Sequence, residues 1–423
     1  MPRSEAEDHT VGGLSEFGLR RVLVVLCVTE IVSWGVLYYA FPVLAPTIAR
    51  DTGWSVSVLT AAFSTGLVVS ALVGIPAGRW IDRFGPRRVM TTGSILAVPA
   101  VVGIALAPSL PVFFAAWVLA GVAMAGTLYA PAFAALTRWW GPRRVTALTA
   151  VTLLAGLAST VFAPLTAALL GPFGWRDTYL TLAGVLAAVT IPAHLFGLRG
   201  PWPAPERVAG TVDHAPADVV RSRTFRVLVV AVALATFAAF AVVVNQVPLL
   251  IERGLSTTQA AWALGLGGLG QVLGRLGYGR LSGALSVRAR SVAIIAASAA
   301  ATLLLAILPG PTALLIAAAM LAGSARGVFT LLQATAISDR WGATHYGRLN
   351  GLLTAPAMVA TALAPWAGAA LAELLGGYPT VFVVLAVLAG IAAVLAAATV
   401  PPAPAGSPTA RPSRPVGGDH QHD

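Results

Sequence analysis

Apolar runs of about 20 residues recur along the whole chain, separated by short segments rich in arginine, proline and glycine. A helix that crosses a bilayer needs about 20 mostly apolar residues, so each run predicts one transmembrane helix. Only 10% of the residues are charged and 57% are hydrophobic, whereas soluble domains carry about 25% charged residues. The predicted spans are 21–45, 55–77, 89–107, 111–136, 145–170, 178–198, 226–251, 258–282, 291–308, 312–336, 347–371 and 379–399. The expected fold class is therefore an all-α polytopic membrane protein with twelve transmembrane helices.

The spans divide into two sets of six. Gly78-Arg79 recurs as Gly279-Arg280, and Trp140-Gly141 recurs as Trp341-Gly342, each 201 residues later. A fixed offset predicts two pseudo-symmetric halves in parallel register, an arrangement that places substrate sites near the bilayer midplane between the repeats. The expected segments are an N-terminal cytoplasmic segment 1–20, a first half 21–198, a Pro-rich cytoplasmic linker 199–225, a second half 226–399 and a disordered cytoplasmic tail 400–423.

Arginine placement predicts the orientation. The chain contains no lysine, so all 27 basic residues are arginine, and with the N-terminus inside all but four of them fall in inner segments. The exceptions are Arg50, Arg176 and Arg253 in outer loops and Arg326 within a span. Because cytoplasmic loops retain excess positive charge, we expect a plasma (inner) membrane protein with both termini cytoplasmic. The lysine-free, Ala-rich composition is typical of a high-GC bacterial genome.

Several function classes are excluded by the same features. Arginines scattered between apolar runs do not form the basic face that binds nucleic acid. Without lysine there is no GxxxxGK[ST] loop for ATP. The six histidines and one cysteine form no cluster of nucleophile, base or metal ligands, so we expect no enzyme, no cofactor and no metal site. The linker and tail hold too few apolar residues for the soluble signalling domain of a sensor.

The inner segment between the second and third spans, "GRWIDRFGPRR", carries the most specific motif. It resembles the GxLaDRxGRR pattern of the major facilitator superfamily at the expected place in the chain, with Trp80 and Pro86 as departures. The matching residues are Gly78, Asp82, Arg83, Gly85, Arg87 and Arg88. The copy in the second half, "GRLSGALSVRAR", has Gly283 in place of the aspartate. The resemblance covers nearly the whole chain.

This resemblance implies a cytoplasmic gate. Asp82 is expected to latch the inner ends of the two halves in the outward-open state, with the arginines pairing nearby carboxylates. Gly78 is expected to allow close helix approach, and Gly85 to make the turn. The alternative is that the arginines only fix the topology.

Within the superfamily, several segments are similar to the monocarboxylate transporter and oxalate:formate antiporter branch. They are "SWGVLYYAFPVLAPTI" in the first span, "TRWWGPRRVTALT" after the fourth, "GWR" before the sixth, and "GQVLGRLGYGRL" in the eighth. In the last segment Arg275 precedes Gly279 by four residues, as the substrate-binding arginine of the branch does. The chain departs from the branch at Val43, where monocarboxylate carriers commonly have lysine, and in the eleventh span, where oxalate carriers use a lysine.

Glu30 and Arg326 lie near the middle of their spans, and Arg275 lies deeper in the membrane than the loop arginines. A charged side chain at the helix centre costs about 2.5–3.5 kcal/mol, so these three residues are candidates for function. We expect Arg275 and Arg326 to bind a substrate carboxylate, because guanidinium offers bidentate geometry. Glu30 is the expected proton-coupling acid. The alternatives are a structural Glu30–Arg326 ion pair and, for Arg275, snorkelling toward the inner headgroups.

Neutral polar and aromatic residues complete the expected substrate site. Asn245, Gln246 and Gln271 either hydrogen-bond substrate or join helices. Trp34, Tyr38 and Tyr39 are expected to line the cavity, with one of the three facing lipid, because consecutive residues of an ideal helix diverge by about 100°.

The predicted function is secondary active transport by alternating access, with proton-coupled carriage of a small organic anion such as a monocarboxylate. The expected partners are that anion, protons and the lipid bilayer, and the expected state is a monomer. The rival function is a proton-driven exporter of drugs or hydrophobic metabolites. Such exporters often carry GPxxGG in the fifth helix, where this chain reads "APLTAA".

Overall fold

The computed structural model describes residues 13–202, 216–341 and 346–399, and these residues are almost entirely helical. The first half holds α1 (Glu16–Trp34), the π-helix η1 (Gly35–Tyr39), α2 (Ala40–Thr52), α3 (Val56–Phe84), α4 (Pro86–Leu106), α5 (Leu110–Thr127), α6 (Tyr129–Trp140), the 3-10 helix η2 (Gly141–Arg143), α7 (Arg144–Ala155), α8 (Ala158–Pro192) and the π-helix η3 (Ala193–Gly197). The second half holds α9 (Pro216–Arg221), α10 (Arg223–Glu252), α11 (Thr257–Ala284), α12 (Val287–Ile307), α13 (Thr312–Thr335), α14 (Ser338–Trp341), α15 (Tyr346–Leu375) and α16 (Tyr378–Ala397).

These helices make twelve passes through the molecule, the number that the sequence predicts. The helices outnumber the passes because several passes consist of more than one helix. The first pass joins α1, η1 and α2, and the fourth joins α5 and α6. Within α8 the chain reverses at Gly174, whose φ of 69° and ψ of 175° are not helical, so α8 ends the fifth pass and begins the sixth. Ten helical stretches of the described residues are long and apolar enough to cross a membrane. That number is below twelve because Arg144–Gly197 contains two passes and the Gly-rich α11 is not among the ten.

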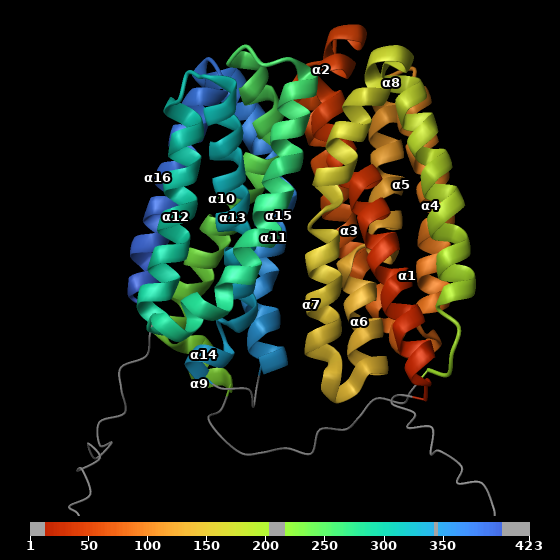
Figure 1. Ribbon diagram of the computed structural model, residues 1–423, viewed down its shortest axis with the longest axis vertical. Coiled ribbons are helices and arrows are strands. Elements are labelled where there is room, and N and C mark those ends of the chain that lie inside the picture. Colours follow the sequence, from red (N-terminus) through yellow and green to blue (C-terminus); the bar gives the residue numbers. More distant parts are fainter. Residues whose placement is uncertain (1–12, 203–215, 342–345, 400–423) are drawn as a thin grey trace, which may run out of the picture.

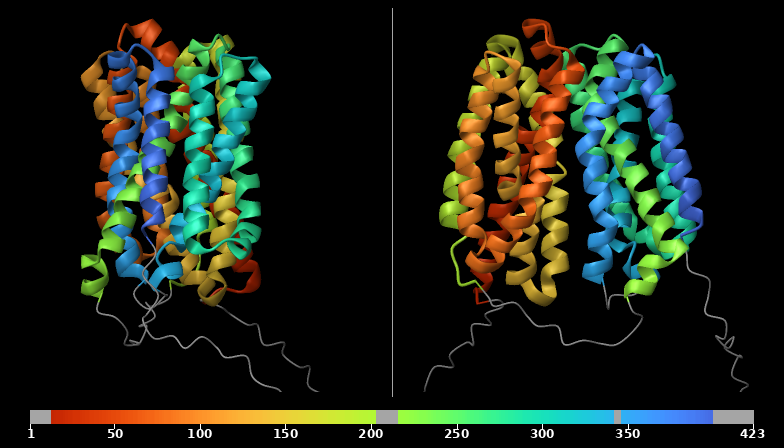
Figure 2. Two further views of the ribbon diagram at one scale, coloured as in Figure 1. Left: turned by 90° about the vertical axis from the view of Figure 1, so that its left-hand side faces the viewer. Right: turned by 180° about the vertical axis from the view of Figure 1, so that it is seen from behind.

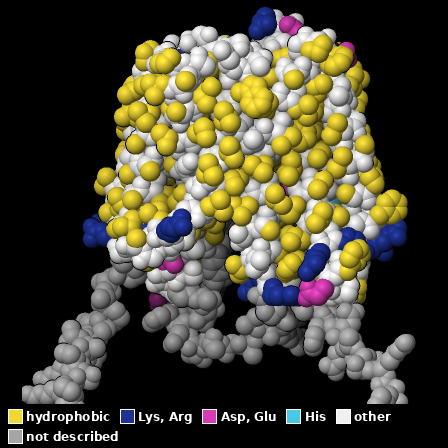
Figure 3. Space-filling view, in the orientation of Figure 1, with side chains coloured by type: hydrophobic (Ala, Val, Ile, Leu, Met, Phe, Trp, Pro, Cys, Tyr) yellow, Lys and Arg dark blue, Asp and Glu magenta, His cyan; other side chains and the backbone are white. Residues whose placement is uncertain are grey.

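The passes form two bundles that stand side by side (Figures 1 and 2), one from each half of the chain. In Figure 1, α1 begins and α16 ends at the lower end of the molecule, which we call the inner end. Arginine side chains gather near this end in Figure 3. The predicted linker 199–225 and terminal segment 1–20 lie partly outside the described residues, and the predicted tail lies wholly outside them.

The two bundles meet mainly toward their outer ends. The Ser57 backbone N–H, at the outer start of α3, donates to Glu373 Oε1 of α15 at 3.1 Å. Further along the same helix pair, the Trp366 N–H donates to Ser64 Oγ at 3.2 Å. Figure 3 shows the surface hollowed between the inner ends of the two bundles. The conformation is therefore open toward the inner end.

The segment Gly78–Arg88 is helical rather than the loop that the sequence predicts. α3 ends at Phe84 and α4 starts at Pro86, so Gly85 alone lies between them. Gly85 has φ 79°, a left-handed value that disfavours other residues, which agrees with its predicted role in the turn. Gly78 makes no close helix contact in this conformation, and the expectation that it allows close approach when the gate closes stays a prediction. A Cβ placed there would meet nothing within 4 Å, because the inner ends stand apart.

Candidate functional site

The first pass gathers three aromatic side chains at the centre of the molecule. Tyr38 and Tyr39 are buried and Trp34 is half-buried. Their rings contact one another, with centroids 5.3 Å apart for Trp34 and Tyr38 and 5.2 Å apart for Tyr38 and Tyr39. Both consecutive tyrosines are buried because Gly35–Tyr39 form a π-helix, which changes the angular spacing on which the expectation of a lipid-facing residue rests. For the half-buried Trp34 that expectation stays a prediction.

Glu30 lies one turn before Trp34 on the same helix. The Trp34 indole Nε1–H donates to Glu30 Oε2 at 3.0 Å. Glu30 is fully buried, and Oε1 has no hydrogen-bond partner among the described residues. A buried carboxyl group with one free oxygen is costly when ionised, so this position favours a group that gains and loses a proton.

Arg326 and Gln271 come together through very close packing of α11 and α13. A Cβ at Gly327 would lie 2.1 Å from the Gln271 carbonyl oxygen, so only glycine fits there. Beside this contact, Arg326 donates from Nε and Nη2 to Gln271 Oε1 at 3.0 and 2.6 Å. Three ion pairs occur among the described residues, and neither Arg326 nor Glu30 belongs to one. The alternative of a Glu30–Arg326 ion pair is therefore not what this structure contains.

Arg275 lies one helical turn beyond Gln271 on α11 and reaches into the other half. Its Nη1 donates to the carbonyl oxygen of Thr152 in α7, just before the fifth pass breaks at Gly156. The residue is only 9% exposed. An Arg275 side chain buried between the halves does not fit the alternative of snorkelling toward the headgroups. Its Nε has no hydrogen-bond partner among the described residues.

Tyr129, at the start of α6, is a site residue that the sequence analysis missed. Its ring centroid lies 5.0 Å from that of Trp34, and its side chain interacts electrostatically with Arg275. It therefore links the aromatic group on the first pass with the arginine on α11. The available signal was Pro131, since residues beside an interruption in a membrane helix often line polar sites.

These side chains form one group, which we call the central cluster: Glu30, Trp34, Tyr38, Tyr39, Tyr129, Gln271, Arg275 and Arg326. Arg326 interacts electrostatically with Tyr38, and Arg275 interacts with Tyr39 and with Arg326. Glu30 interacts in the same way with Tyr129. Two arginines of the second half and one carboxyl group of the first half thus lie around a set of aromatic rings.

Asn245 and Gln246 differ from the cluster in their contacts. Asn245 Nδ2 donates to the carbonyl oxygens of Ala241 at 2.8 Å and of Pro365 at 3.3 Å. Asn245 therefore joins α10 to α15, which is the second of the two roles expected for it from the sequence. Gln246 lines a cavity of about 20 Å³ beside Arg326, and its Nε2 has no partner among the described residues. Such a volume accommodates about one water molecule.

The predicted gate residues lie at the inner end, each with a partner in its own half. Arg138 of α6 donates from Nη2 to Asp82 Oδ1 at 2.9 Å, and the Trp202 indole donates to the Asp82 carbonyl oxygen. Arg87 Nε donates to the Leu195 carbonyl oxygen at 2.8 Å. Arg83 and Arg88 stack against the Phe84 ring. The predicted latch of Asp82 to the other half concerns the outward-open state and stays a prediction.

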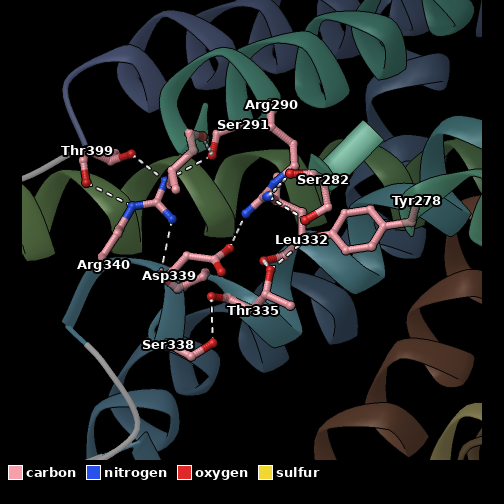
Figure 4. Close-up of polar contacts among 12 residues, drawn as sticks. Tyr278, Ser282, Arg290, Ser291, Leu332, Thr335, Ser338, Asp339, Arg340 and Thr399 are labelled. Atoms are coloured by element: carbon pink, nitrogen blue, oxygen red, sulfur yellow. Dashed lines mark hydrogen bonds and ion pairs between the residues drawn. The ribbon is translucent and has the colours of Figure 1, made fainter. Parts of the chain in front are cut away.

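The second half has its own polar network at the inner end (Figure 4). Arg290 of α12 forms an ion pair with Asp339 of α14 and donates to Ser282 Oγ at 2.7 Å. Arg340 donates to the Thr399 carbonyl oxygen and hydroxyl at 2.8 and 2.9 Å. Burial lowers the pKa of Arg340 to about 10, which still leaves it protonated at neutral pH.

Comparison with known proteins identifies the family. The chain matches the sequence model of the Major Facilitator Superfamily over residues 26–312 and 228–419. The chain belongs to this superfamily. One similar solved structure is a bacterial homologue of the human lysosomal transporter Spinster in an inward-facing, occupied conformation. Its TM-score is 0.72 at 17% identity, and the match covers 90% of this chain and 97% of that one. Another is the nucleoside transporter NupG, with a TM-score of 0.70 at 13% identity over 90% of this chain and 99% of that one. These likenesses confirm the predicted fold.

Curated relatives place the chain near the predicted branch. Rat monocarboxylate transporter 4 is 29% identical over 57% of this chain, and human monocarboxylate transporter 11 is 30% identical over 57%. Each match spans about half of the relative, 51% in both cases. The uncharacterised MFS-type transporter YcxA of Bacillus subtilis is 24% identical over 80% of this chain and 85% of its own length. The prediction of a transporter rather than an enzyme is confirmed at the level of the family.

Proposed function

We propose that this protein is a secondary active transporter that carries a small organic anion, such as a monocarboxylate, together with a proton. It works as a monomer by alternating access in the plasma membrane, with both termini in the cytoplasm. Its inner gate closes when Asp82 leaves Arg138 for the second half. The conformation open toward the inner end is one of the two states that such a cycle requires.

The central cluster carries this proposal, above all its two guanidinium groups, neither of which has an ion-pair partner in the part of the chain that the structure describes. Arg275 and Arg326 repel each other electrostatically, and a carboxylate between them relieves that repulsion. Gln271 fixes the Arg326 guanidinium through two hydrogen bonds, so the cation is oriented before substrate arrives. The rings of Tyr38, Tyr39 and Tyr129 exclude water and select a small organic body rather than a hydrated inorganic ion.

Glu30 supplies the proton coupling in this proposal. Its buried position disfavours ionisation, and Tyr129, which interacts electrostatically with both Glu30 and Arg275, connects it to the arginines that hold the substrate. Substrate and proton binding are thereby linked: an anion at the arginines favours the protonated form of Glu30. The reverse also holds, since linkage is reciprocal.

Uptake by proteoliposomes tests the proposal. The wild type, Arg275→Gln and Glu30→Gln are compared with a panel of radiolabelled carboxylates under an imposed pH gradient. Arg280→Gln is the matched control, because Arg280 lies on the same helix but is exposed. We expect Arg275→Gln to abolish uptake, Glu30→Gln to remove only its dependence on the pH gradient, and Arg280→Gln to retain both. Movement of hydrophobic dyes but of no carboxylate would overturn the proposal in favour of an exporter.

A further inference from the structure

Two adjoining hollows lie on the first half, where α4 begins. The inner pocket has a volume of about 590 Å³ and lies between the start of α4, η3 and Trp202. The second hollow, which we call the α3–α5 groove, has a volume of about 340 Å³ and extends from Phe84 toward Leu96 and Val122. Phe84, Arg88 and Thr92 line both hollows. The pocket and the groove are therefore one continuous surface with two chemically different ends.

The inner pocket is cationic. Arg87 and Arg88 line it, and none of its lining residues is acidic. Arg88 is exposed. Among the described residues, Arg87 donates only from Nε, to the Leu195 carbonyl oxygen, so the other four of its five N–H donors remain available. The nearest acid of the gate motif, Asp82, is already paired with Arg138. An anion in the pocket thus meets two guanidinium groups without a competing carboxylate.

The start of α4 adds backbone donors to the same pocket. Gly85 caps this 21-residue helix without a side-chain hydrogen bond, and Pro86 occupies the first helical position. The amides of Arg87 and Arg88 therefore have no partner within the helix, and the helix dipole favours an anion at this end. Independently, Thr91 lines the pocket and is 9% exposed, and its hydroxyl has no hydrogen-bond partner among the described residues.

The α3–α5 groove is apolar and open to the surface, where Trp80 and Phe84 are exposed. It is lined mainly by residues such as Val73, Ala77, Trp80 and Leu96. A corresponding groove of about 500 Å³ exists in the second half, where Leu281, Ala293 and Ala297 stand 201 residues after Trp80, Thr92 and Leu96. No arginine lines that second groove. The offset takes Arg87 to Arg288 but Arg88 to Ala289, so the arginine that lines both hollows of the first half has no counterpart in the second.

We propose that the inner pocket and the α3–α5 groove together bind one anionic phospholipid of the inner leaflet. The phosphate lies at Arg87, Arg88 and the free amides of α4, and one acyl chain occupies the groove. Basic pockets between helices on the cytoplasmic side are suited to such headgroups. A free phosphate would use the pocket but not the groove, so the continuity of the two hollows favours a lipid as the occupant.

Native mass spectrometry of the delipidated full-length protein in detergent tests this site. Binding is measured for phosphatidylglycerol, for zwitterionic phosphatidylcholine and for soluble glycerol 3-phosphate as a competitor. Arg88→Gln removes a charged donor at an exposed position, and Val73→Trp fills the groove. Arg79→Gln is the matched control, because Arg79 is exposed in the same motif but lines neither hollow.

We expect phosphatidylglycerol to bind more tightly than phosphatidylcholine, and Arg88→Gln to weaken phosphatidylglycerol binding by about tenfold, as expected for loss of a charge-assisted hydrogen bond. Val73→Trp should weaken it as well, and Arg79→Gln should not. Equal binding by the wild type and Arg88→Gln would overturn the site. Full displacement of the lipid by glycerol 3-phosphate would show a site for free phosphate instead, and equal losses in Arg79→Gln would show non-specific attraction.

Discussion

The packing of α11 against α13 gives a sharp prediction, because it holds the Arg326–Gln271 contact in place. Replacing Gly327 by alanine puts a Cβ 2.1 Å from the Gln271 carbonyl oxygen and 2.9 Å from its Cα. Both atoms are backbone, so no side chain can move aside. The helices must separate by about 1 Å, and close-packed interiors transmit such a strain.

The magnitude follows from a comparison with Gly277→Ala, whose Cβ on α11 would meet nothing within 4 Å. Both substitutions gain the same intrinsic helix propensity, about 1 kcal/mol. The difference between the variants is therefore the overpacking cost alone, about 1–3 kcal/mol in a well-packed core. We expect Gly277→Ala to stabilise the protein and Gly327→Ala to be less stable than Gly277→Ala by that amount.

The free energy of unfolding, measured by titration with a denaturing detergent, checks this difference. The same variants are then assayed for uptake. Displacing a binding group by about 1 Å can lower a rate by about a hundredfold, so Gly327→Ala should lose uptake while Gly277→Ala retains it. If the two variants are equally stable, the close approach of α11 and α13 does not constrain the protein, and the argument that it orients Arg326 fails.

Three further outcomes are expected. Asp339→Ala should destabilise the protein by about 3 kcal/mol in the same titration, because it leaves Arg290, 5% exposed in its side chain, without its ion-pair partner. Asp82→Ala should cost less than about 1 kcal/mol, since Asp82 is 66% exposed in its pair with Arg138; equal costs for the two aspartates would contradict this reasoning. Tyr129→Phe should raise the half-saturating substrate concentration with little change in stability, measured by uptake kinetics, and an unchanged value would remove the Tyr129 hydroxyl from the site.

Hydropathy and motif spacing predict the fold well, because a bilayer leaves few alternatives to apolar helices. The twelve passes and the turn at Gly85 follow from the order of the residues alone. Gln271 and Arg275 are also predictable as neighbours, since residues four apart share a face of a helix.

Side-chain partners between helices could not be predicted in the same way. Arg326 pairs with Gln271 rather than Glu30 because of the glycine contacts between α11 and α13, and periodicity does not show which helices pack most closely. The π-helix at Gly35–Tyr39 leaves no signal in the apolar pattern, so the burial of both Tyr38 and Tyr39 does not follow from ideal helical spacing. Tyr129 was missed because its importance depends on Trp34 and Arg275, which lie on other passes.

At the inner end, one pair of equivalent positions in the two halves carries opposite charges. The offset of 201 residues takes Arg138 to Asp339 and Asp82 to Gly283. Both positions nevertheless take part in an ion pair, Arg138 with Asp82 in the first half and Asp339 with Arg290 in the second. In the first half the acid of the pair, Asp82, lies near the end of α3. In the second half the acid, Asp339, lies in α14 after the tenth pass, and its partner Arg290 is buried. An exposed carboxylate exchanges partners at little cost, whereas a buried pair does not. In the proposed gate, the first half therefore supplies the residue able to switch partners, and the second half supplies the rigid side.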